Sequence, residues 1–146
     1  IDGRDIWPLI EGRPGGHSPQ EAYHFYWGDE LQAVRMGRWK LHFPHRYRTL
    51  GNRKAGTGGK PEPYEQADVA LTLFDIENDA GETIDVKGKH PDVVAAIEKL
   101  ADRMREDLGD SARKMAGSGR RPVGRVQKGD EHFVLKDGKQ TLAEAQ

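Results

Sequence analysis

The chain has 146 residues, of which 35% are hydrophobic, 18 are glycine and 8 are proline, and this predicts one domain with a modest core and much of its length in loops. Its net charge of -1, from 23 basic and 24 acidic residues, excludes nucleic-acid binding through the charge of the chain as a whole. The absence of cysteine excludes disulfides, thiolate metal sites and cysteine nucleophiles.

Residues 1–12 predict a short helix or a tight turn. Apolar residues stand at positions 6, 7, 9 and 10, and Pro8 suits a first helical turn because that position needs no N–H donor. Turn-forming residues fill 13–20 and predict an exposed loop.

The next predicted element is a strand at 21–28 that is dense in aromatic residues. Alternation places three rings on one face of this strand: Tyr23, Phe25 and Trp27. A small sheet needs large side chains to bury, so we expect this stripe to join Trp39 and Phe43 in the core. The alternative is an exposed platform that stacks on sugar rings.

A hairpin is the strongest short-range prediction. It covers 31–43, where apolar and polar residues alternate on both sides of Gly37, which is expected to take the positive φ of a tight connection. A further short strand is expected at 71–74. Between them, 44–68 is charged and rich in glycine, and we expect a long loop that is either functional or disordered.

The clearest helix is predicted for 90–109. Pro91 fits the first helical position, and Asp92 suits the positive N-terminal end. Apolar residues recur at steps of three or four and form one stripe: Val93, Ile97, Leu100, Met104 and Leu108. Gly109 ends the helix. The rest of the chain is polar and irregular, apart from a strand and turn expected at 132–139.

These elements predict an α+β fold, in which a small antiparallel sheet of three to four strands packs against one C-terminal amphipathic helix, with long loops and a flexible tail. We expect one subdomain at 1–124 and a polar tail at 125–146 that is disordered or forms a short hairpin. No apolar run approaches the roughly 18 residues of a membrane span, and no signal peptide is present. Because the chain begins at Ile1 rather than Met, we expect an excised piece whose targeting information lay upstream.

The stretch LFDIENDAGETID, at 73–85, places acidic residues around a glycine, as a calcium loop does. An EF-hand loop that starts at Asp75 needs glycine at its sixth position and glutamate at its twelfth, but these positions hold Ala80 and Val86. We therefore interpret the stretch as a turn in which Asp75 and Asn78 bond the nearby backbone, and we expect no metal ligands in the chain.

Two further clusters favour a structural interpretation over a ligand. His24 and His42 are expected on neighbouring strands, where paired histidines more often pack or hydrogen-bond than bind zinc. The basic pairs at 53–54, 113–114 and 120–121, with Arg125 and Lys128, suit a polyanion, and nucleic-acid binding through the basic tail is the weaker alternative. The acidic residues of the helix before them and the balanced composition favour a solvated tail. We therefore expect neither a nucleic-acid partner nor a membrane partner.

Four segments, in this order, resemble the C-terminal subdomain of the type I, formylglycine-dependent, arylsulfatase-like sulfatases. They are IDGRDIWPLIEG at 1–12, LQAVRMGRWKLHFP at 31–44, LFDIENDAGETIDV at 73–86 and HPDVVAAIEKLADRM at 90–104. The resemblance covers about residues 1–124. Ala80 departs from the family's usual proline, and Asp85 departs from its frequent asparagine.

The resemblance implies a parent enzyme that hydrolyses sulfate esters with a formylglycine nucleophile and a calcium ion. The family makes this nucleophile from Cys or Ser in the motif C/S-x-P-S-R or C/S-x-A-x-R, and no serine of this chain stands in such a motif. The chain therefore resembles a non-catalytic portion that holds no cofactor, is inactive alone and packs against the catalytic domain of the same parent. Ile6, Trp7 and Leu9 are candidates for that contact. The resemblance implies a periplasmic or secreted parent.

In such an enzyme, loops of this subdomain border the substrate pocket. Five residues are predicted to contact a sulfated carbohydrate: His42, His45, Arg46, Tyr47 and Arg48. Arginine pairs well with sulfate oxygens, and aromatic rings stack on sugar faces. The simpler interpretation is a solvated basic loop. A second function is an autonomous module that binds sulfated or anionic polysaccharide through 44–60.

Overall fold

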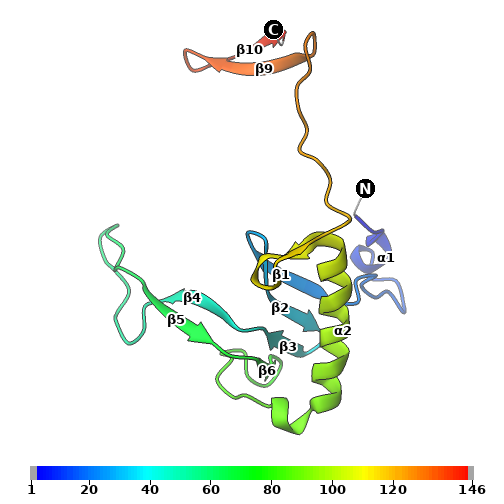
Figure 1. The fold of residues 1–146 in the computed structure, drawn as a ribbon, viewed down its shortest axis with the longest axis vertical. Coiled ribbons are helices and arrows are strands. Elements are labelled where there is room, and N and C mark those ends of the chain that lie inside the picture. Colours follow the sequence, from blue (N-terminus) through cyan, green and yellow to red (C-terminus); the bar gives the residue numbers. More distant parts are fainter. Residues whose placement is uncertain (1–2, 145–146) are drawn as a thin grey trace.

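The structure, a computed structural model, describes residues 3–144. Its centre is a four-stranded antiparallel sheet in the order β1-β2-β3-β6, and the helix α2 lies across one face of it (Figure 1). These elements are β1 (Tyr23–Trp27), β2 (Glu30–Met36), β3 (Trp39–His42), β6 (Thr72–Asp75) and α2 (Pro91–Leu108). This architecture confirms the predicted α+β fold class.

The hairpin of β2 and β3 forms as predicted. A two-residue turn joins the strands, with Met36 opposite Trp39. Gly37 has a φ of +57°, which is the left-handed region that glycine adopts without a steric penalty. β6 extends the sheet on the other side of β3, with Leu73 opposite Leu41.

A β-bulge decides which side chains of β2 face the helix. The pairing of β1 with β2 shifts register between Phe25 and Tyr26, so that Gln32 is an extra residue on β2. Leu31 and Val34 are three positions apart, yet both lie in the core because the bulge turns Leu31 to the same face.

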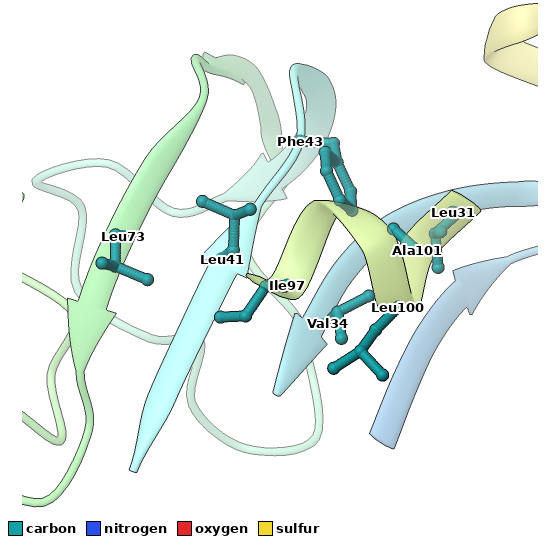
Figure 2. Close-up of a cluster of buried hydrophobic side chains, with 8 residues drawn as sticks. All are labelled: Leu31, Val34, Leu41, Phe43, Leu73, Ile97, Leu100 and Ala101. Atoms are coloured by element: carbon teal, nitrogen blue, oxygen red, sulfur yellow. The ribbon is translucent and has the colours of Figure 1, made fainter. Parts of the chain in front are cut away.

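The hydrophobic core lies between α2 and the sheet. Figure 2 shows its side chains, which come from both layers: Leu31, Val34, Leu41, Phe43, Leu73, Ile97, Leu100 and Ala101. The predicted helical stripe is confirmed for Ile97 and Leu100. It is wrong for Leu108, which is 43% exposed, because Arg105 takes the buried position in the last turn of the helix.

The aromatic stripe of β1 faces away from α2, which corrects the prediction that it belongs to the core. Tyr23 is 65% exposed and Trp27 is 67% exposed. The helix covers the opposite face of the sheet, where Tyr26 packs against the core instead. The prediction holds for Phe43, which is buried in the core, and for Trp39, which packs against it.

The segment 44–68, predicted to be one long loop, contains two strands. β4 (His45–Thr49) and β5 (Glu65–Val69) pair antiparallel in a second hairpin that projects from the main sheet (Figure 1). Tyr and Thr at alternate positions favour the extended chain of β4, and the charge and glycine content of its surroundings concealed this preference. The loop itself is confined to 50–64.

After α2 the chain first forms two short strands that pack against α2 and β2, and only then extends away from the sheet. β7 (Gly109–Asp110) pairs with β8 (Met115–Ala116), where the sequence predicted irregular chain. An extended segment then leads to the hairpin of β9 (Glu131–Lys136) and β10 (Lys139–Glu144), which lies apart from the sheet and α2 (Figure 1). This hairpin confirms the strand and turn predicted at 132–139.

Three short helices complete the fold. They are α1 (Trp7–Ile10), as predicted for the N-terminal segment, and two 3₁₀ turns at Lys87–Lys89 and Ser111–Arg113. None of the helices in the described part of the chain is long and apolar enough to cross a membrane.

A buried ion pair fastens the end of α2 to the sheet. Arg105 Nε donates to Asp110 Oδ2 at 2.9 Å, and these two side chains are 1% and 2% exposed. Asp110 Oδ1 also accepts from the backbone N–H groups of Leu31 and Ala112, at 3.4 and 3.1 Å. The guanidinium carbon of Arg105 lies 4.3 Å from the centroid of the Phe43 ring, so the charge is paired and packed.

Candidate carbohydrate-binding site

The five residues predicted to contact a sulfated carbohydrate lie in and beside β4, on two faces. Alternation along the strand puts His45 and Tyr47 on one face and Arg46 and Arg48 on the other. His42, at the end of β3, stacks on His45 with 5.6 Å between the ring centroids. Two neighbouring sites result, rather than the single cluster that the sequence suggested.

The first site, the Trp27 pocket, lies between the end of β1 and the β4–β5 hairpin. It has a volume of about 400 Å³ and is lined by Trp27, Gln32, Arg46, Tyr47, Arg48 and Gln66. The guanidinium carbon of Arg48 lies 5.9 Å from the centroid of the Trp27 ring, a distance at which a cation is attracted to an aromatic face.

The Trp27 pocket presents two guanidinium groups and two side-chain amides. Within residues 3–144, Arg46 is held only by a 3.6 Å ion pair with Asp68, in which both side chains are largely exposed. Arg48 forms no ion pair with a carboxylate among residues 3–144. The amides of Gln32 and Gln66 add donors and acceptors, and a guanidinium can bind an oxyanion through two N–H groups at once.

The second site, the His42 cluster, joins Lys40, His42 and His45 to Glu82. His42 Nε2 lies 2.8 Å from Glu82 Oε2, and Lys40 Nζ donates to Glu82 Oε1 at 2.6 Å. His45 Nδ1 lies 2.7 Å from the carbonyl oxygen of Phe43, which accepts its proton. A single carboxylate therefore orients a lysine and an imidazole on the outer face of the sheet.

Burial lowers the pKa of His42 below its ordinary value of 6.5, and the charge of Lys40 acts in the same direction, while Glu82 opposes both. The imidazole is therefore neutral at neutral pH and donates its Nε2 proton to Glu82. Its Nδ1 atom is buried and has no hydrogen-bond partner among the described residues. Glu82 has a φ of +54°, a strained backbone conformation for a residue other than glycine.

A pocket of about 330 Å³ opens beside the His42 cluster. Its lining residues are His42, His45, Tyr47, Val69, Phe74, Gly81 and Glu82. Tyr47 lines both this pocket and the Trp27 pocket, so β4 is the wall between them.

His24 and His42 do not lie on neighbouring strands, which corrects the sequence prediction. β2 separates β1 from β3, and His24, opposite the buried Val34, faces α2. His42 follows the buried Leu41 and so points to the other face of the sheet. Within residues 3–144, no three side chains of His, Cys, Asp or Glu lie close enough together to hold a metal ion.

In the acidic stretch 73–85, Asp79 holds the turn, whereas Asp75 and Glu82 bond side chains outside the stretch. Asp79 Oδ2 accepts from the N–H groups of Thr83 and Ile84 at 2.7 and 2.8 Å, and the bond from Ile84 is the main cause of the lowered pKa of Asp79. Asp75 accepts from Arg38 Nε at 2.7 Å, and this bond lowers the pKa of Asp75. The stretch forms the predicted turn, but Asn78 differs from the prediction, because its side chain donates to Asp75 Oδ2 at 3.0 Å instead of bonding the backbone.

Sequence reasoning missed five residues of the two sites. They are Trp27, Gln32, Lys40, Gln66 and Glu82. Trp27 was placed in the core, and Gln66 lies on a strand that was not predicted. The alternation in 45–49 was a usable signal, because a strand there separates the arginines from His45 and Tyr47. The sequence held no signal for Gln32, which reaches the pocket from a bulge.

Comparison with known proteins agrees with the arrangement of these elements. A family model described as the C-terminal region of aryl-sulfatase matches residues 18–129. No curated protein matches the chain. The matched region contains the main sheet, α2 and both sites, and it ends just before β9.

Proposed function

Because the chain belongs to the family that forms the C-terminal region of aryl-sulfatases, we propose that it is the non-catalytic portion of a sulfatase, a hydrolase of sulfuric esters. The family match over 18–129 carries this proposal. The chain has no cysteine and no serine in a formylglycine motif, so the nucleophile and the calcium ion are assigned to the catalytic domain of the parent. The role of this portion is to support that domain and to shape its substrate pocket.

The exposed apolar side chains at α1 support docking on the catalytic domain. Ile6, Trp7 and Leu9 are 46%, 55% and 47% exposed, and Ile10 beside them is 63% exposed. Apolar surface gains about 25 cal/mol for each Å² removed from water, so four such side chains in one short segment favour a covering partner. We therefore propose that Ile6, Trp7 and Leu9 contact the catalytic domain.

The Trp27 pocket supports a contact with sulfated carbohydrate. Arg46 and Arg48 supply guanidinium groups for sulfate oxygens, and Trp27 supplies a face for a sugar ring. His42 and His45 are assigned a positioning role through β4, because they lie on the other side of this strand. Tyr47 lines the Trp27 pocket as well as the pocket beside the His42 cluster, so its side chain can contact a sugar bound in the Trp27 pocket.

The second candidate function is an autonomous module for anionic polysaccharide, using the basic loop 44–60. The two exposed arginines of β4, Arg46 and Arg48, favour this polysaccharide-binding module as well. It differs from the first proposal because it needs no catalytic domain and because the basic residues outside the Trp27 pocket contribute to binding. Arg53 is such a residue, and it already pairs with Glu65 at 3.6 Å.

The isolated chain separates the two functions by two readouts. We expect no hydrolysis of 4-nitrophenyl sulfate, with or without calcium, and weak retention on a heparin column at low salt. Arg48→Ala is expected to weaken retention, since a hydrogen bond to a charged group contributes about 1.5–3 kcal/mol, while Arg53→Ala is the matched control. Strong retention that Arg53→Ala also reduces would favour the module. Hydrolysis that a substitution in the chain abolishes would contradict the non-catalytic assignment.

A further inference from the structure

The hairpin of β9 and β10 has an apolar face that its own chain leaves uncovered. Phe133 lies opposite Leu142, and Leu135 shares their face two positions along β9. These three side chains are 68%, 55% and 79% exposed, respectively. An isolated two-stranded hairpin is marginally stable in water, so this hairpin needs a surface to pack on.

The same chain carries a hollow of suitable character on the outer face of the main sheet. The hollow has a volume of about 620 Å³, and its lining includes Tyr23, Phe25 and Arg35. The rings of Tyr23 and Phe25 meet edge to face, with 4.7 Å between centroids. β1 is an edge strand of the four-stranded sheet, so its outer backbone edge is open to another strand.

The hollow and the hairpin each offer one charge that can pair across them, while Glu21 in the lining is already paired with Arg103 at 2.8 Å. Arg35 Nε donates to the carbonyl of Gly37, and Arg35 forms no ion pair within residues 3–144. Glu131 lies on the same face of β9 as Phe133, and it also has no ion-pair partner in the described part of the chain. A hairpin seated in the hollow can therefore bring a glutamate to an unpaired arginine.

The linker to the hairpin starts at the end of β1 that is farther from the hollow. Ser118 N donates to the carbonyl of Glu106 at 2.9 Å, and Gly119 N donates to that of Asp107 at 2.8 Å. Arg120 then pairs with Asp29 at 3.2 Å, just after the C-terminal end of β1, whereas the hollow lies at the N-terminal end. From this anchor the linker runs away from the sheet (Figure 1).

We propose that the β9–β10 hairpin of one copy docks in the hollow of a second copy of this chain. A free edge of the hairpin pairs with β1, and Phe133 and Leu142 pack on Tyr23 and Phe25. Because each copy supplies one hairpin and one hollow, a two-fold exchange satisfies both and closes as a dimer. The family match ends at residue 129, so the hairpin is an addition to the shared region, and the dimer is a property of this chain rather than of the family.

Introduced cysteines test the exchange, because the chain has none of its own. Tyr23→Cys in a chain with one affinity tag is mixed with Leu142→Cys in a chain with another tag, under mild oxidation. We expect a disulfide between the two differently tagged chains. Ile84→Cys is the matched control for Tyr23→Cys, since Ile84 is 61% exposed and lies outside the hollow, and it is expected to give only background cross-linking.

Sedimentation equilibrium of the unmodified chain is the independent measurement. We expect twice the mass of one chain, and a return to the single mass in Phe133→Ser/Leu142→Ser with the helical far-ultraviolet circular dichroism signal of α2 retained. A single-chain mass at every concentration would overturn the proposal, as would a dimer that survives this double substitution. An internal disulfide in one chain that carries both cysteines would also overturn it, because the hairpin would then dock on its own body.

Discussion

At the scale of single residues, Glu82 shows how a strained backbone conformation can be retained. A non-glycine residue with φ of +54° costs of the order of 1–3 kcal/mol. The carboxylate offsets this cost by accepting from Lys40 and by fixing the imidazole of His42. The positive φ is therefore best explained by the placement of the carboxylate, which holds both side chains on the outer face of the sheet.

The lowered pKa of His42 predicts that acid destabilises the fold. In the unfolded chain the imidazole titrates near 6.5, whereas in the folded chain its pKa is lower. Between these two values the unfolded state binds more protons, so this contribution is complete above pH 6.5 and is lost as the pH falls toward the folded value. Urea denaturation from about pH 8 to about pH 5 measures the effect.

Replacing His42 with Gln should flatten part of this pH dependence. Burial lowers the pKa of His24 as well, so a remaining slope is expected from that residue. His17→Gln, on an exposed loop, is the matched control and should leave the profile unchanged. An equal slope in the original chain and in His42→Gln would show that His42 is not the titrating group.

At the scale of elements, the end of α2 depends on one buried carboxylate. Asp110→Ala removes the buried partner of the Arg105 guanidinium, which keeps only the more exposed Asp102 at 2.8 Å, and it removes the acceptor of two backbone N–H groups. Breaking a buried pair in this way costs about 3–5 kcal/mol of unfolding free energy. Asp68→Ala removes an exposed partner of Arg46 and should cost under about 1 kcal/mol. Chemical denaturation compares the two variants, and equal losses would contradict the assignment.

The elements also show where sequence reasoning succeeds. The period of α2 and the alternation around Gly37 are local properties, so they predicted a helix and a hairpin that the structure confirms. Alternation along β1 assigned its side chains correctly to two faces of the sheet. It did not indicate which face α2 covers, so the prediction that Tyr23 and Trp27 lie in the core was wrong. That choice depends on packing between distant segments, and so does the bulge that brings Gln32 to the pocket.

For the candidate site as well, local sequence patterns were informative and contacts between distant segments were not predictable. The residue types of 42–48 indicated anion binding, and the structure places Arg46 and Arg48 on one pocket with Trp27. The separation of His42 and His45 from these arginines required the strand β4, which the surrounding glycine and charge concealed. Glu82 joined the second site from 40 positions away in sequence, and no local pattern contains that information.

At the scale of the whole molecule, three surfaces extend beyond the core. They are the apolar segment at α1, the Trp27 pocket and the β9–β10 hairpin. Our proposals assign the first to the catalytic domain of the parent, the second to sulfated carbohydrate and the third to a second copy of the chain. The central claim is that this portion of a sulfatase contacts the substrate without taking part in the chemistry.

Steady-state kinetics of a sulfatase that contains this chain distinguishes substrate contact from participation in the chemistry. Removing an interaction that is equally strong in the ground state and the transition state raises KM and leaves kcat unchanged. We therefore predict that Trp27→Ala and Arg48→Ala raise KM for a sulfated saccharide by about tenfold or more, as expected for losing about 1.4 kcal/mol of binding, with kcat preserved. A fall in kcat at constant KM, or no change in either constant, would contradict the account.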